Sequence, residues 1–289
     1  MNVKPRILVV DIDGTLLNRQ GVIAPVDREA VTRASRSGIR VSLSTGRVVE
    51  ASRRILEHLG LDGYHVFFDG ALVADPQTGE EVYAESIDRK LLGDIVDFVG
   101  ENGITMELYS STRYFIEEEN WAADIRRNFF GIEPTLVDFD SVWREERIIK
   151  ATLPVRSRDE KTKLEHFDRQ FGSRLNLSWT GTPAYPDEHF INVINGRASK
   201  GKALEELASF LGIPLSETAA IGDGINDVSL LSRAGLAIAM ASAPDELKAL
   251  ADYVVPDVEN NGVAVAIEQY LLQASGGTIP SPGKPGTSG

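Results

Sequence analysis

The segment Asp11-Ile-Asp-Gly-Thr-Leu-Leu17 directly follows an apolar run, residues 7–10, which is typical of a buried strand. Two acids and a tight turn would therefore lie at the carboxyl end of a strand, the edge where open α/β sheets bind ligands. Because side chains alternate along an extended chain, Asp11 and Asp13 would point in different directions around one small volume. An ordinary Asp-Gly turn explains this segment equally well, so the rest of the chain has to decide.

Strands and helices alternate in the first and last parts of the chain. The apolar patterns predict strands at 7–10, 39–43, 65–68, 218–221, 236–240 and 253–255, and helices at 26–37, 48–59, 199–211, 227–233, 244–251 and 263–272. Strands separated by helices form parallel sheets. The middle differs, because it mixes a helix at 89–101 with alternating segments and holds all three Trp. We therefore expect an α/β, doubly wound, Rossmann-like core interrupted by an α+β insertion.

Composition excludes several classes of function. The formal net charge of −13 over 289 residues argues against binding a nucleic-acid backbone. The absence of Cys excludes disulfides, thiol catalysis and cysteine-ligated metals. No run approaches the ~20 apolar residues of a membrane helix, and the amino terminus lacks the pattern of a secretory signal. We expect a cytoplasmic protein, a monomer or weak homodimer, that binds a small molecule and neither nucleic acid nor membrane.

Polar clusters follow other predicted strands. Thr45-Gly46-Arg47 offers a hydroxyl, an amide and a guanidinium, which suit an anionic oxygen at a helix start; a helix cap with a solvated Arg47 is the alternative. Lys200 lies at the head of a predicted helix, where the helix dipole does not favour a cation. A buried cation that neutralises a phosphate would explain Lys200, and a solvated surface Lys is the alternative.

The segment Gly222-Asp223-Gly-Ile-Asn226-Asp227 places three oxygen-bearing side chains directly after a predicted strand. Ligand sets made only of oxygen suit a hard cation such as Mg²⁺. A turn that caps the next helix is the alternative, but clustered carboxylates repel one another unless a cation or a proton intervenes. Together, the four clusters are the equipment for phosphoryl transfer through an aspartyl-phosphate.

The order and spacing of these clusters resemble the haloacid dehalogenase superfamily, most of all its Cof-type (subclass IIB) phosphatases. The resemblance covers about residues 5 to 272, and it includes Ser44–Arg47, Ser199–Gly201, Ala251–Val254 and Gly262–Ala264. It implies a discontinuous core at 1–82 and 191–273, with a substrate-specificity cap at 83–190. The remaining 274–289, rich in Gly, Pro and Ser, is expected to be a flexible tail.

The resemblance also implies a role for each residue. Asp11 would be the nucleophile and Asp13 the general acid and base. Mg²⁺ would be held by the Asp11 carboxylate, the Asp13 backbone carbonyl and Asp223, with Asp227 orienting the site from beside it. The phosphoryl oxygens would be bound by Thr45, Gly46, Lys200 and Asn226. The expected reaction is Mg²⁺-dependent hydrolysis of sugar phosphates or similar small phosphomonoesters.

The chain departs from the family pattern at two positions, Asp69 and Asn192, where the family often has Asn and an acid respectively. Both lie near the expected boundary of core and cap, so they bear on the substrate. Arg47 and Asn192 are the candidate substrate contacts. Two other functions stay open: a sugar phosphomutase on the same scaffold, and a non-catalytic protein that binds a phosphorylated ligand or signals.

Overall fold

The computed structural model describes residues 4–182 and 185–272, and the predicted tail at 274–289 lies outside the described residues. The described chain divides into two compact units. The first contains 4–45, 58–61 and 204–272, and the second contains 46–57 and 62–203 apart from 183–184. The core and cap boundaries expected near residues 83 and 190 stay a prediction.

The first unit is built on a parallel sheet. Its strands are β1 (Ile7–Asp11), β2 (Arg40–Ser44), β12 (Thr218–Gly222), β13 (Leu236–Met240) and β14 (Tyr253–Val255), in the order β14-β13-β12-β1-β2. Every pairing between these strands is parallel. All of β1 is buried, which explains its continuous apolar run, because helices cover both faces of a parallel sheet. The expected α/β class with a parallel sheet is confirmed.

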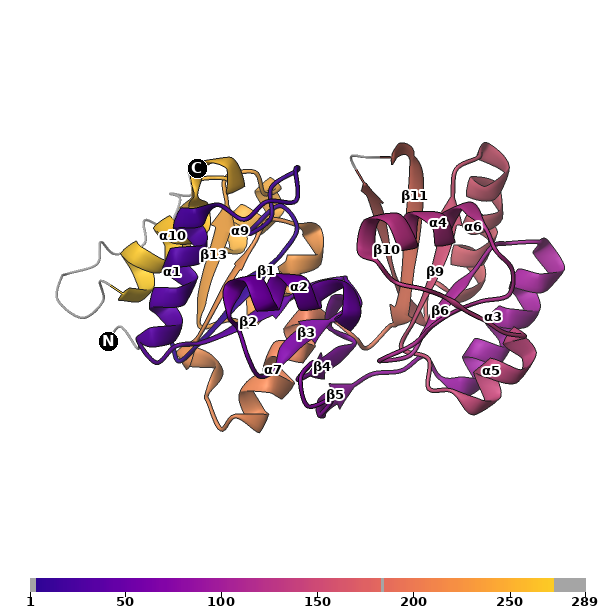
Figure 1. Ribbon diagram of the computed structural model, residues 1–289, viewed down its shortest axis with the longest axis horizontal. Coiled ribbons are helices and arrows are strands. Elements are labelled where there is room, and N and C mark those ends of the chain that lie inside the picture. Colours follow the sequence, from indigo (N-terminus) through magenta and orange to yellow (C-terminus); the bar gives the residue numbers. More distant parts are fainter. Residues whose placement is uncertain (1–3, 183–184, 273–289) are drawn as a thin grey trace, which may run out of the picture. The chain divides into compact units, whose positions relative to one another are not determined.

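Short helices surround this sheet. They are α1 (Pro25–Arg36), α7 (Lys200–Phe210), α8 (Val228–Arg233), α9 (Asp245–Leu250) and α10 (Gly262–Ala266). Ile7 and Val9 pack with Leu204 and Leu230 in one core cluster, and α1 runs beside α10 (Figure 1). The predicted helix at 263–272 ends as α-helix at Ala266 and continues as a π-turn, Ile267–Leu272.

The second unit contains a small antiparallel ribbon and most of the helix α2 (Val49–Leu59). The ribbon consists of β3 (His65–Phe67), β4 (Leu72–Ala74) and β5 (Glu81–Ala84). A 3₁₀ turn, Phe68–Gly70, joins β3 to β4, with φ of 53°, 53° and 95° at its three residues. Positive φ is costly for a bulky residue such as Phe, so this turn is a strained segment. Phe68 thus belongs to the turn and not to the predicted strand.

A six-stranded sheet with the order β10-β11-β9-β6-β7-β8 completes the second unit. Its strands are β6 (Glu107–Tyr109), β7 (Tyr114–Ile116), β8 (Thr135–Leu136), β9 (Lys150–Val155), β10 (Leu175–Thr182) and β11 (Tyr185–Asn195). The helices α3 (Arg89–Asn102), α5 (Phe139–Glu145) and α6 (Arg158–Phe171) pack together on one side of this sheet (Figure 1). A short helix, α4 (Trp121–Ile125), packs on Phe190 instead. This is the expected inserted α+β region. None of the described helices is long and apolar enough to cross a bilayer.

Candidate active site

Three carboxylates gather at the carboxyl ends of two neighbouring strands. Val10 of β1 pairs with Ile221 of the parallel strand β12, so the residues that follow them reach the same edge of the sheet. Each of Asp11, Asp223 and Asp227 offers a carboxylate oxygen, and these oxygens all lie within 4.8 Å of one another. The structure thus brings together three of the residues that the sequence motifs single out.

Neighbouring groups hold these carboxylates in place. The Thr15 hydroxyl donates to Oδ1 of Asp223 (2.8 Å). The backbone amides of Asp223 and Gly224 both donate to Oδ2 of Asp227 (3.0 Å each). Hydrogen bonds from fixed donors orient an acidic side chain and favour its charged form. The site is therefore prearranged by its own surroundings.

Gly14 has to be glycine for two reasons. Its φ of +89° is a conformation that residues with a side chain rarely adopt. A Cβ at this position would also lie 2.3 Å from Oδ2 of Asp223. The Asp-Gly turn thus lets the backbone after Asp13 approach the acidic group closely.

The acidic group suits a hard divalent cation. Asp227 is fully buried and Asp11 is 6% exposed, so water screens the repulsion between their charges poorly. A bound Mg²⁺ would offset that repulsion, and it prefers carboxylate oxygens. The Asp13 and Asn226 side chains, in contrast, are exposed, where they can reach a ligand or solvent.

The predicted phosphate-binding residues lie where β2 ends and the second unit begins. Asp11 pairs with Ser44 in the last register of β1 and β2, and the next residue, Thr45, is 1% exposed. Gly46 follows it, and a Cβ there would lie 2.8 Å from Oδ2 of Asp69. A side chain at position 46 would displace the Asp69 carboxylate, so Asp69 is a close neighbour of the predicted phosphate loop.

Lys200 is a buried cation and not a solvated one. Its side chain is 1% exposed at the start of α7, as the phosphate-binding interpretation requires. The strained turn described above packs against this helix start, because a Cβ on Gly70 would lie 2.2 Å from the carbonyl of Ser199 and 2.5 Å from the Lys200 nitrogen. The same turn carries Asp69, so it contacts both Gly46 and the backbone of Lys200.

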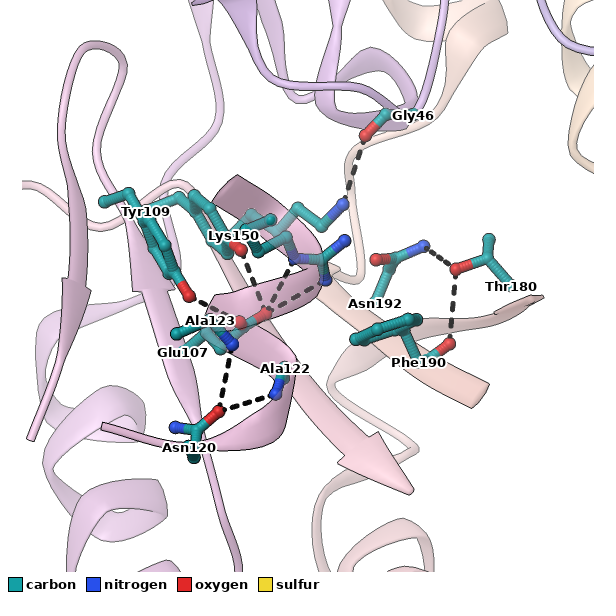
Figure 2. Close-up of polar contacts among 12 residues, drawn as sticks. Gly46, Glu107, Tyr109, Asn120, Ala122, Ala123, Lys150, Thr180, Phe190 and Asn192 are labelled. Carbon is teal, nitrogen blue, oxygen red and sulfur yellow. Dashed lines mark hydrogen bonds and ion pairs between the residues drawn. The ribbon is translucent and has the colours of Figure 1, made fainter. Parts of the chain in front are cut away.

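The two candidate substrate contacts have different surroundings. Arg47 is partly exposed, and its guanidinium carbon lies 5.5 Å from the centre of the Phe130 ring. Asn192 is 5% exposed on β11, and its amide donates to the hydroxyl of Thr180 (3.3 Å) within the six-stranded sheet (Figure 2). The described contacts do not join Arg47 to Asn192.

A buried polar cluster surrounds Glu107 in the second unit. Glu107 accepts hydrogen bonds from the hydroxyls of Tyr109 (2.9 Å) and Tyr114 (2.6 Å) and from two nitrogens of Arg126 (2.9 and 3.2 Å). Burial, and next the Glu107 charge, raise the pKa of Tyr114 well above its ordinary value. Tyr114 therefore stays protonated and acts as a hydrogen-bond donor to Glu107.

Lys150 and Thr152 were not expected to take part in a site, although both are buried polar residues of β9. Lys150 donates to the backbone carbonyl of Gly46 (3.1 Å; Figure 2). The sequence pattern that could have indicated them is the alternation of polar and apolar residues in Lys150-Ala-Thr-Leu153, which is typical of a strand with two different faces.

Comparison with known proteins establishes the family. The model of the haloacid dehalogenase-like hydrolases matches residues 8–267, and the chain belongs to this family. It is 28% identical to "Phosphatase YwpJ" of Bacillus subtilis, over 92% of this chain and 100% of that protein. It is 26% identical to "Pyridoxal phosphate phosphatase YbhA" of Escherichia coli, over 92% of this chain and 99% of that protein. The expected hydrolase class, a Cof-type phosphatase, is confirmed.

Solved structures show the same fold. The subclass IIB sugar phosphatase BT4131 superposes with a TM-score of 0.74 at 24% identity, and the match covers 92% of this chain and 98% of that one. At this level of identity the likeness concerns the fold alone.

Proposed function

We propose that this phosphatase hydrolyses small phosphorylated metabolites, such as sugar phosphates, in a Mg²⁺-dependent reaction through a phosphorylated Asp11. The observation that carries the proposal is the group formed by Asp11, Asp223 and Asp227, with carboxylate oxygens within 4.8 Å of one another. The relatives named as phosphatases support the same substrate class, because one of them acts on pyridoxal phosphate.

The metal would be held by the carboxylates of Asp11 and Asp223 together with the backbone carbonyl of Asp13. Asp227 orients this group through its hydrogen bonds to the Asp223 and Gly224 amides. When bound, Mg²⁺ would supply positive charge that offsets the repulsion between a carboxylate nucleophile and a phosphate.

The chain's own residues would carry out both steps of the reaction. The Asp11 carboxylate attacks phosphorus, the bond from phosphorus to the ester oxygen breaks, and Asp13 gives its proton to the leaving alcohol. Asp13 then takes a proton from water, which attacks the phosphorylated Asp11 and releases inorganic phosphate. Thr45, the Gly46 amide, Lys200 and Asn226 would hold the transferring phosphoryl oxygens.

The substitution Asp11→Asn tests this function. A carboxamide is a poor nucleophile, so we expect Mg²⁺-dependent phosphate release from a panel of phosphomonoesters to fall at least about a thousandfold. Asp94→Asn, an exposed position on α3, is the matched control and should keep full activity. Circular dichroism should show that both variants remain folded. Near-normal turnover by Asp11→Asn would refute the assignment.

A further inference from the structure

The six-stranded sheet has a buried apolar face and a polar face, and on the polar face Glu107, Thr152 and Asn192 are buried. Register places Ser178, Asn192, Thr152 and Glu107 side by side across β10, β11, β9 and β6. Residues directly opposite one another in antiparallel strands share a face, and so does Lys150, two positions before Thr152. The residues that alternate with them point to the other face and belong to the apolar cluster under α3, α5 and α6; they are Leu108, Ala151, Leu153, Ile191 and Val193.

Two groups on this polar face lack the partners that burial normally demands. The Thr152 hydroxyl is fully buried and makes no hydrogen bond within the described part of the chain. Lys150 is 6% exposed, and its ammonium group donates one hydrogen bond, to the neutral carbonyl of Gly46. An ammonium has three donors. Buried polar groups without partners are costly, so both groups need a ligand to complete them.

The charge of Lys150 is also uncompensated at close range. Within the residues that the structure describes, no carboxylate forms an ion pair with its ammonium. Glu107, an acid on the same face, is already bound by Arg126 and two tyrosines. Burial lowers the pKa of Lys150 most strongly, the charge of Arg126 also lowers it, and the charges of Asp69 and Glu107 raise it, so that the pKa lies at about 8. Buried charges in proteins are normally paired, so the missing partner is an anion.

We propose that Lys150, with Thr152 and Asn192 beside it, binds a second acidic group on the substrate, a carboxylate or a second phosphate on the leaving alcohol. The position of Lys150 supports this role, because the same ammonium contacts Gly46 of the predicted phosphate loop. The inference rests on the proposed function and narrows it to phosphomonoesters that carry two acidic groups.

Matched substrates test the proposal. The rates to compare are kcat/KM for glycerol phosphate against phosphoglycerate, and for a hexose monophosphate against the corresponding bisphosphate. In at least one pair, we expect the wild type to prefer the compound with the second acidic group by about tenfold or more in kcat/KM. A preference for phosphoglycerate would indicate that the second group is a carboxylate, and a preference for the bisphosphate would indicate a second phosphate. Lys150→Met should raise KM for the preferred acidic member by about tenfold or more, with its neutral partner changed less than about twofold.

Lys163→Met is the matched control, because Lys163 also donates to a glycine carbonyl, that of Gly103 (3.2 Å), but is 32% exposed and pairs with Asp159. This variant should keep the preference for acidic substrates.

In the wild type, kcat/KM for the substrate with the second acidic group should fall as pH rises through about 8, where Lys150 loses its proton. Lys150→Met should lack this fall. If Lys150→Met lowered kcat/KM equally for both members of each pair, Lys150 would only support the structure around Gly46, and the proposal would be overturned.

Binding separates this inference from the proposed function. The same four compounds can be titrated calorimetrically into Asp11→Asn, alone and combined with Lys150→Met. If the wild type hydrolyses none of them, the proposed function fails for this class, and the titration still decides the inference. The inference would be supported if Asp11→Asn bound an acidic member more tightly than its neutral partner and if adding Lys150→Met abolished this difference. Equal binding of acidic and neutral members would overturn it.

Discussion

At the scale of single residues, Thr15 is important because its hydroxyl orients the Asp223 carboxylate. It is fully buried and donates to Oδ1 of Asp223. We expect Thr15→Val, which has nearly the same shape, to weaken Mg²⁺ binding by about 10- to 100-fold, because such outer partners fix the direction of a metal ligand. Calorimetric titration with Mg²⁺ measures this. Thr162→Val, whose exposed hydroxyl bonds only within its own helix, should bind Mg²⁺ normally; the same affinity in both variants would contradict the role given to Thr15.

The sequence could indicate which acids meet but not what holds them. Asp11, Asp223 and Asp227 are predictable, because each follows an apolar strand and parallel strands share one carboxyl edge. For Lys200 the sequence left a buried cation and a solvated one open, and its side chain is buried. The partners of these groups depend on contacts across the sheet that no local pattern encodes. Lys150 escaped notice because a single Lys within a strand looks like a solvated residue until its burial is known.

At the scale of elements, the helix α10 is capped by a residue far away in the sequence. The helix α10 begins at Gly262. Asp27 of α1 is fully buried, and its carboxylate accepts a hydrogen bond from the backbone amide of Ala264 (2.7 Å). Burial raises the pKa of Asp27, and this hydrogen bond lowers it in part. Asp27 thus replaces the local cap that Asn261 does not provide.

Two substitutions of Asp27 should therefore differ. Asp27→Ala removes the acceptor, and we expect a loss of about 1–2 kcal/mol in the free energy of unfolding. Asp27→Asn keeps an acceptor and removes a buried charge, so its cost should stay below about 0.5 kcal/mol. Urea denaturation of the two variants measures both values. Should Asn prove as costly as Ala, the capping role would have to be abandoned.

Elements were predictable where hydrophobic periodicity acts alone. The strands at 236–240 and 253–255 have the predicted bounds, and the predicted helix at 26–37 is α1 (Pro25–Arg36). The pattern failed at Phe68, which belongs to the turn Phe68–Gly70 and not to the predicted strand at 65–68. It also could not show how the acidic turn is held, because Oδ2 of Asp227 accepts hydrogen bonds from the backbone amides of Asp223 and Gly224. It also missed most strands of the inserted sheet, where buried polar residues such as Glu107 and Thr152 break the rule that polar residues are exposed.

At the scale of the whole molecule, the acidic group should link stability to metal. A Mg²⁺ ion bound to the folded chain would relieve the repulsion between its carboxylates. At about 100 times its Kd, Mg²⁺ should stabilise the fold by about 2.7 kcal/mol, a rise of roughly 5 °C in Tm. Adding EDTA should reverse the rise. Asp223→Asn should show no such rise and should unfold, without metal, at or above the Tm of the wild type; an undiminished rise in this variant would place the metal elsewhere.

The position of β1 in the sheet has a consequence for how the chain folds during its synthesis. One neighbour of β1, the strand β2, is made almost at once, but its other neighbour pairs Ile7 with Thr218. At typical rates of translation, roughly 10–40 s separate the two strands. During this interval β1, which is apolar except for Asp11, has one edge unpaired while the inserted sheet is completed, and pairings with distant strands form slowly. The nascent chain should therefore be most prone to aggregation, and most dependent on chaperones, just before β12 emerges from the ribosome.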